Sequence, residues 1–138
     1  MHQLTTRRRV EFSDTDMGGI VHFSRFFVFM ETAEHELFRT LGVSVHFQHE
    51  GGTVGWPKVA ATCEYRSPAR YGDELEIELK IRNKGSKALT SGFTIRCQGR
   101  LVAEGRLTSV CCRLDGPEGV RAIPIPEFLA AQIEEAPE

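Results

Sequence analysis

The sequence has 138 residues, a length typical of one domain, and its 41% hydrophobic and 26% charged residues suit a globular chain that buries a core. A formal net charge of -2 and a pI near 6.2 provide no overall attraction to nucleic acid or to an anionic membrane. We find no signal-peptide pattern and no apolar run of roughly 18 residues. We therefore expect a cytoplasmic protein with no nucleic-acid partner and no membrane insertion.

The first predicted element is a strand from Leu4 to Phe12, because Leu4, Val10 and Phe12 alternate with charged residues. The basic run at residues 7–9 lies inside this alternation. We interpret it as a solvated or salt-bridged face rather than as a nucleic-acid patch.

A long helix is predicted from about Ser24 to Leu41, where apolar residues recur at helical spacing. Ser24 suits the N-cap, and Gly42 suits the left-handed conformation that ends many helices. The wide apolar surface indicates a central helix enclosed on several sides. The polar residues expected at its surface are Glu31, His35, Glu36 and Arg39.

Residues 43–52 are expected to form an irregular connection, and alternation beyond it predicts four more strands. These strands cover residues 59–66, 74–82, 89–97 and 101–113. A short helix from Glu127 to Ile133 and a frayed tail at about 134–138 follow. Hairpin-length connections require antiparallel pairing, so residues 1–138 are predicted to form a single α+β domain with about five strands curled round one helix.

The four cysteines lack C-x-x-C spacing and fall in strand-like segments, where a reduced thiol behaves as a small apolar group. They are Cys63, Cys97, Cys111 and Cys112. His46 and His49 have H-x-x-H spacing, but the polar segment around them offers no evident third ligand. We predict no metal site.

The segment from Asp14 to Phe27 is the strongest candidate for an active site. A strand ends there, two glycines permit a turn, and the aromatic helix begins. The N–H groups at a helix start can polarise a carbonyl oxygen, and Asp16 lies just upstream as a potential nucleophile or base. Taken alone, Asp16 fits a turn-forming role equally well, because aspartate before Gly-Gly is common in turns.

In residues 14–21 the pattern D-x-D-x-x-G-x-V resembles the hotdog-fold thioesterases of the 4-hydroxybenzoyl-CoA thioesterase and Tol-Pal-associated acyl-CoA thioesterase group. Residues 65–73 and 121–126 resemble two further segments of that family, so the resemblance covers nearly the whole chain. It implies a hotdog fold and hydrolysis of an acyl-CoA thioester to free acid and CoA. CoA is then part of the substrate, and no cofactor is implied.

The resemblance implies that Asp16 is the catalytic carboxylate, either attacking the thioester carbonyl or acting as a base for water. It also implies that the backbone N–H of Phe23 polarises the carbonyl oxygen, with Asp14 as a structural neighbour. Many family members read Tyr-His where this chain has His22-Phe23. We keep His22 as a candidate for proton transfer, with a structural hydrogen bond as the alternative.

For the CoA phosphates the resemblance indicates the turn Lys84-Gly85-Ser86-Lys87. Lys87 matches a basic position of the family; we add Lys84 for its ammonium group, with Ser86 between them. A solvated turn is the alternative. The candidate acyl-pocket residues, for which core packing is a competing explanation, are Gly19, Phe26, Phe27, Met30 and Trp56.

Two other functions stay open: a non-catalytic module that binds or senses acyl-CoA, and a thioesterase or dehydratase that acts on an acyl carrier protein. A curled sheet covered by one helix leaves open edges, so we also predict a homo-oligomer. The expected form is a homotetramer built from dimers, with each active site completed by a second subunit.

Overall fold

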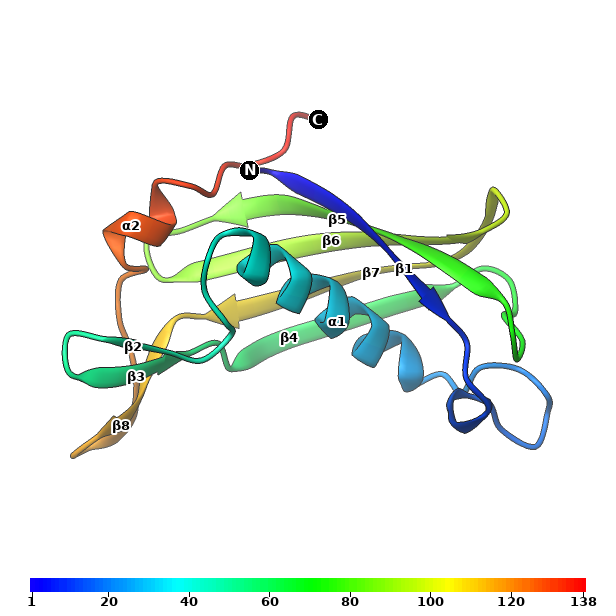
Figure 1. Ribbon diagram of the computed structural model, residues 1–138, viewed down its shortest axis with the longest axis horizontal. Coiled ribbons are helices and arrows are strands. Elements are labelled where there is room, and N and C mark those ends of the chain that lie inside the picture. The colour runs from blue at the N-terminus through cyan, green and yellow to red at the C-terminus, as the bar shows by residue number, and fades with distance from the viewer.

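A single long helix packs across a curled antiparallel sheet in the computed structural model, which describes residues 1–138 (Figure 1). The order of the main sheet is β1-β5-β6-β7-β4. Its elements are β1 (Gln3–Arg9), β4 (Lys58–Tyr65), β5 (Glu74–Lys84), β6 (Ala88–Cys97) and β7 (Arg100–Val110), with helix α1 (Arg25–Thr40) against one face. Neither helix of the chain has the length and apolar character needed to cross a membrane. The predicted α+β hotdog architecture is confirmed.

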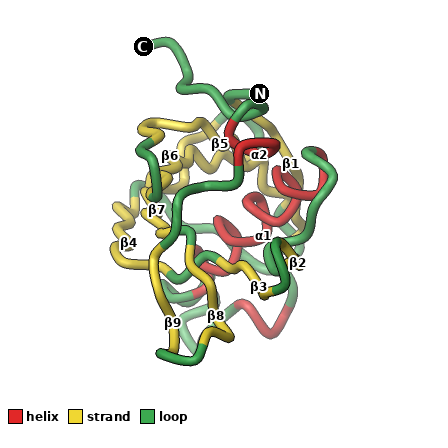
Figure 2. The backbone as a smooth tube through the Cα atoms, turned by 90° about the vertical axis from the view of Figure 1, so that its left-hand side faces the viewer, coloured by secondary structure: helices red, strands yellow, loops and turns green.

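A second, smaller sheet corrects two sequence-based expectations. Its order is β2-β3-β8-β9, and Figure 2 shows β3, β8 and β9 together at one end of the molecule. Its strands are β2 (Phe47–His49), β3 (Gly52–Gly55), β8 (Cys112–Gly116) and β9 (Gly119–Ala122). Residues 43–52, expected to be irregular, therefore contain β2 and the start of a hairpin. The total of about five strands describes only the main sheet.

The predicted strand over residues 101–113 is broken at Cys111, which belongs to neither β7 nor β8. Its N–H donates to the carbonyl oxygen of Lys87 at 2.7 Å, and its own carbonyl accepts from the N–H of Ile123 at 2.9 Å. Because Cys111 pairs outside the β6–β7 ladder, the chain leaves the main sheet there and enters the small one.

The core lies between α1 and the inner face of the main sheet. Alternate residues of β5, from Leu75 to Ile81, are fully buried, which confirms the strand predicted with one face inward. In β7, a Cβ at Gly105 would lie 2.2 Å from Cε of Met30 and 2.7 Å from the carbonyl oxygen of Thr62. Glycine at this position therefore allows α1 to approach the sheet closely.

The ends of α1 lie within one residue of the prediction, and Gly42 has the expected positive φ of 90°. The Ser24 hydroxyl does not cap the helix, because it pairs with Nδ1 of His22 at 2.8 Å. Glu34, for which we predicted no role, is buried on α1, and Nζ of Lys58 lies 3.0 Å from its carboxylate. Burial raises the pKa of the Glu34 carboxyl, and the nearby ammonium offsets this only in part.

The two chain ends also differ from expectation. β1 stops at Arg9, and Phe12 begins the 3-10 turn η1 (Phe12–Asp14) with its ring 79% exposed instead of facing the core. Helix α2 (Glu127–Ala130) is shorter than predicted. The tail expected to fray is hydrogen-bonded, with Glu134 N–H donating to Met1 and Ala136 N–H to Ile81 at 3.0 and 2.8 Å.

Asp14 connects the elements that carry the candidate site. Its side chain is fully buried and accepts hydrogen bonds from Nε of Arg25 at 2.8 Å, the N–H of Glu11 at 2.9 Å and the guanidinium of Arg8 at 3.4 Å. Burial alone would raise the pKa of Asp14, but the Glu11 hydrogen bond and the two arginines together outweigh it and lower that pKa. One carboxylate thus joins β1, η1 and α1.

Asp14→Asn is expected to lower the free energy of unfolding by about 2 kcal/mol at neutral pH, because the two guanidinium groups lose their charged partner. The pKa of Asp14 is lowered in the fold, so its contribution is complete above the unfolded pKa of about 3.9 and disappears as the pH falls through the folded value. Urea unfolding of both proteins from pH 7 to pH 2 measures this. A difference that stays constant down to pH 2 would contradict the assignment.

Candidate active site

Asp16 lies in a tight turn between η1 and α1. Its N–H donates to the carbonyl oxygen of Ile20, and the N–H of Gly19 donates to the carbonyl oxygen of Asp16, both at 3.0 Å. Gly19 has a φ of +79°, which a side chain would strain. One carboxylate oxygen of Asp16 accepts the N–H of Gly18 at 2.8 Å, while the other has no partner in the chain. The turn therefore fixes the backbone of Asp16 and leaves one carboxylate oxygen without a hydrogen bond.

The start of α1 is held by backbone hydrogen bonds on both sides of Phe23. The N–H of His22 donates to the carbonyl oxygen of Asp14 at 2.8 Å, and the carbonyl of His22 accepts from Arg25 at 2.9 Å. The carbonyl of Phe23 accepts from the Tyr65 hydroxyl at 3.0 Å. The N–H of Phe23 donates to no group of the chain, so a fixed donor remains at the helix start.

A cavity of about 520 Å³ lies between the Asp16 turn, the start of α1 and the segment that follows β4. The ring of Phe26 meets that of Tyr65 edge to face, with centroids 5.5 Å apart. The residues around the cavity, six of them hydrophobic, are Asp16, Ile20, Val21, Phe23, Phe26, Tyr65, Arg66, Ser67, Pro68 and Ala69. A carboxylate and a helix start therefore share one largely apolar hollow.

Four of the predicted site residues fall at or beside this cavity. Asp16, Phe23 and Phe26 line it, and Gly19 lies in the adjoining turn. His22 does not line it: its ring packs against that of Phe23 at 4.6 Å between centroids and pairs through Nδ1 with Ser24. The structural hydrogen bond foreseen as the alternative for His22 is therefore present.

The other candidates for the acyl pocket lie elsewhere in the chain. Met30 is fully buried over Gly105, and Phe27 is half-buried against the core. Trp56 stacks on Phe38, with ring centroids 5.0 Å apart, in the last turns of α1. Within one chain, these three residues are packing residues and do not reach the cavity.

The lysine turn lies at the opposite end of the main sheet from the Asp16 turn (Figure 1). Nζ of Lys84 donates to the carbonyl oxygens of Ala130 and Ile133 at 2.5 and 2.8 Å, so this ammonium holds the end of α2. Lys87 is exposed and makes no side-chain contact with an acid. Ser86 accepts the N–H of Ile125 through its carbonyl. A single chain does not bring this turn to Asp16.

Sequence reasoning missed one wall of the cavity, which is formed by the end of β4 and the segment after it. Tyr65 closes the hollow with its ring and hydroxyl, and Pro68 and Ala69 complete that side. The N–H of Val21 donates to the carbonyl oxygen of Ala69 at 2.8 Å, which holds the segment against the Asp16 loop. The resemblance over residues 65–73 was the available indication, because nothing else in the sequence connects this segment with Asp16.

Comparison with known proteins gives consistent matches. The model of the thioesterase-like superfamily matches residues 10–133. The chain is 30% identical over 112 residues to a 1,4-dihydroxy-2-naphthoyl-CoA hydrolase of Synechococcus sp. (strain CC9605), covering 78% of this chain and 75% of that protein. It is also 30% identical over 107 residues to the acyl-CoA thioester hydrolase YbgC of Escherichia coli O157:H7, covering 75% and 77% respectively.

Among solved structures, the 4-hydroxybenzoyl-CoA thioesterase from Pseudomonas sp. strain CBS-3 superposes with a TM-score of 0.80 over 95% of this chain and 99% of that one. Its sequence identity is 24%, so this likeness is one of fold. The matched family model and the shared architecture show that the chain belongs to the thioesterase-like superfamily of hotdog-fold proteins.

Proposed function

We propose that this protein hydrolyses an acyl-CoA thioester to free acid and CoA in the cavity beside Asp16. The observation that supports this is the pairing of an exposed carboxylate with an unpaired backbone N–H at the start of α1, both on one apolar hollow. The relatives named as hydrolases of CoA thioesters support the same reaction class.

In this proposal the N–H of Phe23 donates to the thioester carbonyl oxygen. Negative charge grows on that oxygen as the carbon becomes tetrahedral, and the positive end of the α1 dipole stabilises it. The carbonyl of His22, in the same peptide unit as this N–H, is held by Arg25. The donor is therefore oriented before the substrate arrives.

Asp16 supplies the second catalytic group, by one of two routes. As a nucleophile it attacks the thioester carbon, expels the CoA thiolate and forms an anhydride, which water then hydrolyses. As a general base it removes a proton from water, which attacks the same carbon and expels the same thiolate. The exposed oxygen of Asp16 is the reacting atom in both routes.

The apolar cavity wall indicates that the acyl group enters beside Phe23, Phe26 and Tyr65. A module that only bound or sensed acyl-CoA would have no use for an exposed carboxylate beside the helix start. An acyl carrier protein as the acyl donor would leave the chemistry at Asp16 unchanged, since both donors present the acyl group as a thioester.

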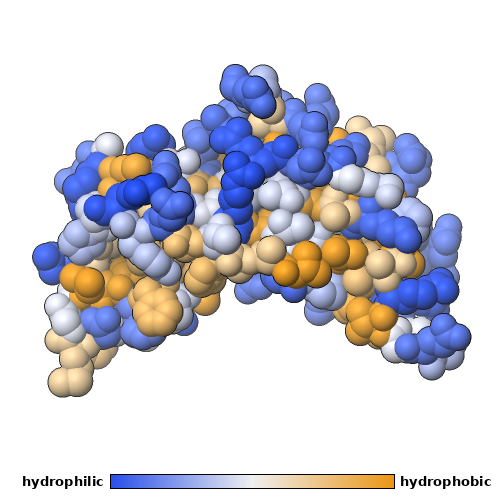
Figure 3. Space-filling view, turned by 180° about the vertical axis from the view of Figure 1, so that it is seen from behind, coloured by the Kyte–Doolittle hydropathy of each residue, from blue (hydrophilic) through white to orange (hydrophobic).

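We also propose that the active form is an oligomer built on a β4-to-β4 dimer. β4 is an edge strand of the main sheet, and its side chains are exposed on both faces, including Val59 at 62%. Figure 3 shows the lower margin of the molecule hollowed between two projecting lobes, with apolar colour along it. Figure 1 places β4 at this margin. An unpaired strand of this kind is a template for pairing with a second copy.

A two-fold axis at β4 would turn the second subunit end for end. Lys87 of the partner subunit would then lie at the same end of the joined sheet as Asp16, instead of at the far end (Figure 1). We propose that this lysine meets the CoA phosphates, whereas Lys84 stays with α2. A tetramer built from two such dimers remains our proposal for the full assembly.

Asp16→Asn is expected to reduce kcat for acyl-CoA hydrolysis about 10³-fold, because it removes charge and basicity at nearly constant volume. Substrate binding and thermal stability should stay close to wild type, since the side chain is exposed. Free thiol release over a panel of acyl-CoAs measures the effect. Asp14→Asn is the comparison and should mainly lower stability, because Asp14 holds Arg8 and Arg25. Retained turnover in Asp16→Asn would refute the assignment.

Lys87→Ala is expected to raise KM about 5-fold for CoA thioesters and to leave KM unchanged for acyl-pantetheine, which lacks the nucleotide phosphates. Lys84→Ala serves as the comparison, because its ammonium binds the end of α2. It should lower thermal stability and leave the ratio of the two KM values unaltered. If Lys87→Ala changed KM equally for both substrates, the turn would not be part of the CoA site.

A mixed-subunit experiment tests the shared site. When Asp16→Asn and Lys87→Ala chains pair at random, about half of the dimers are mixed. In a mixed dimer one shared site carries both changes and the other carries neither. These intact sites should restore about a quarter of the wild-type activity at low substrate concentration. Sites built within one chain would give only the mean of the two parent activities. Sedimentation of the wild type should show no active monomer.

A further inference from the structure

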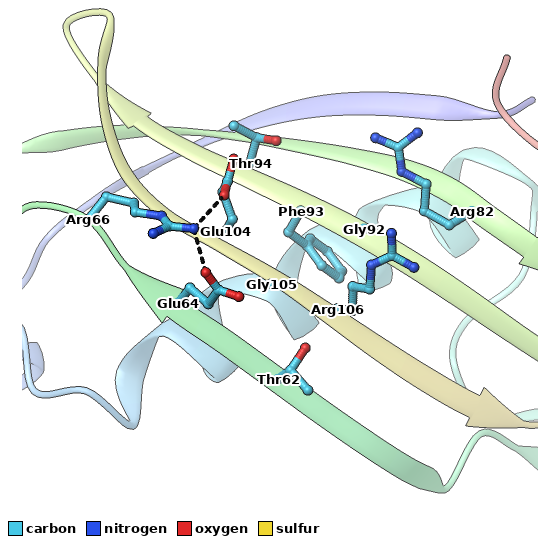
Figure 4. Close-up of a pocket in the computed structure, with 10 residues that line it drawn as sticks. All are labelled: Thr62, Glu64, Arg66, Arg82, Gly92, Phe93, Thr94, Glu104, Gly105 and Arg106. Carbon is cyan, nitrogen blue, oxygen red and sulfur yellow. Dashed lines mark hydrogen bonds and ion pairs between the residues drawn. The ribbon is translucent and has the colours of Figure 1, made fainter. Parts of the chain in front are cut away.

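The outer face of the main sheet carries a second hollow, of about 370 Å³, on the side away from α1 (Figure 4). Strand alternation shows which side chains around the hollow point to that face. Phe93 pairs with Gly105 across β6 and β7, and Gly105 faces Met30 in the core. The neighbouring pair, Gly92 and Arg106, therefore points outward.

Acidic groups are already engaged at one end of this hollow. Arg66 forms ion pairs with both Glu64 and Glu104, the second at 3.4 Å, and Figure 4 shows it bridging the two carboxylates. Arg82 and Arg106, at the other end, form no ion pair and donate no hydrogen bond within the chain. Two guanidinium groups therefore face one hollow without a carboxylate partner.

Gly92 forms the floor between these two arginines. A Cβ at Gly92 would lie 2.9 Å from Cγ and 3.0 Å from Nε of Arg82, so the Arg82 side chain lies directly over the glycine backbone. Figure 4 shows both guanidinium groups on the same side of the sheet, with Gly92 between their strands. The absence of a side chain at position 92 thus brings Arg82 towards Arg106.

We propose that Arg82 and Arg106 form a binding site for the phosphate group of a small phosphorylated ligand. A guanidinium presents a planar fork of donors that matches phosphate oxygens, and two forks can hold a doubly charged anion from two sides. The chain as a whole carries a net charge of -2, so the attraction is local to this hollow. Arg66 lines both this hollow and the Asp16 cavity, but Arg82 and Arg106 lie at the other end of the hollow and do not line that cavity, so an anion between them is bound apart from Asp16.

Titration calorimetry with inorganic pyrophosphate at constant ionic strength tests this site on the intact protein. The wild type should bind it saturably, and Arg82→Gln or Arg106→Gln should each weaken the Kd about 10-fold. The double variant should abolish saturable binding. Arg96→Gln, at an arginine of the same sheet that does not line the hollow, is the matched control and should keep the wild-type Kd.

Gly92→Ala provides a second variant in which both arginines are retained. Its methyl group displaces the Arg82 side chain, so pyrophosphate binding should weaken while activity with acyl-CoA persists. The proposal is overturned if the wild type shows no saturable binding, or if the double glutamine variant binds as tightly as the wild type. If the wild type does not bind pyrophosphate and the double glutamine variant forms a smaller oligomer than the wild type, the two arginines make a contact between subunits instead.

The phosphate group could belong to the CoA of the substrate or to a separate metabolite. A titration with adenosine 3′,5′-bisphosphate, which represents the nucleotide end of CoA, distinguishes these two sources. Tighter binding than pyrophosphate, together with a raised KM for acyl-CoA in the double variant, would identify the substrate's own nucleotide. Weaker binding with an unchanged KM would identify a separate phosphorylated metabolite. Both results support the anion site at Arg82 and Arg106.

Discussion

The buried carboxylate of Asp14 is the contact on which the candidate site depends. Its side chain holds the arginines of β1 and α1, and its carbonyl accepts the N–H of His22, so one residue ties the helix start to the end of the first strand. Thr15 is extended and bridges to Val21. Asp14 is the last residue of the 3-10 turn η1 and is buried, whereas Asp16 follows the extended Thr15, begins the next turn and is exposed. The two aspartates of the D-x-D pattern therefore differ in environment: Asp14 is bound by two arginines, and Asp16 carries the exposed carboxylate that we propose as the reactive one.

Elements with strong local periodicity were predictable from the sequence. The alternation in β5 and the helical spacing that ends at Gly42 reflect which face each residue buries, and the structure confirms both. The small sheet was not predictable in this way. β2 has three residues and β3 has four, which is too short for a pattern, and the break at Cys111 is set by hydrogen bonds to distant residues. The residues next to Cys111 in the sequence do not indicate those partners.

The same distinction applies to the candidate site. Asp16, Phe23 and Phe26 are close in the chain, so sequence reasoning placed them together correctly. Tyr65 follows about 40 residues later and reaches the cavity only through the curl of the sheet. Lys84 was assigned to the phosphates from its charge alone, but its ammonium binds the carbonyl oxygens of Ala130, the last residue of α2, and of Ile133 beyond it. A sequence shows which residues are charged, whereas the groups that bind a charged side chain are known only from the folded structure.

The main sheet has an inner face, an outer face and the β4 edge, and a single chain protects these three surfaces to different extents. Its inner face is buried under α1. Its outer face is polar, and neighbouring charges pair there, as Lys80 does with Glu78 at 3.7 Å and Arg66 with Glu104. That face is compatible with water without a protein partner. The β4 edge has no such compensation, because its backbone groups on one side and Val59 remain uncovered. The edge, rather than the outer face, is therefore where the fold most needs a second subunit.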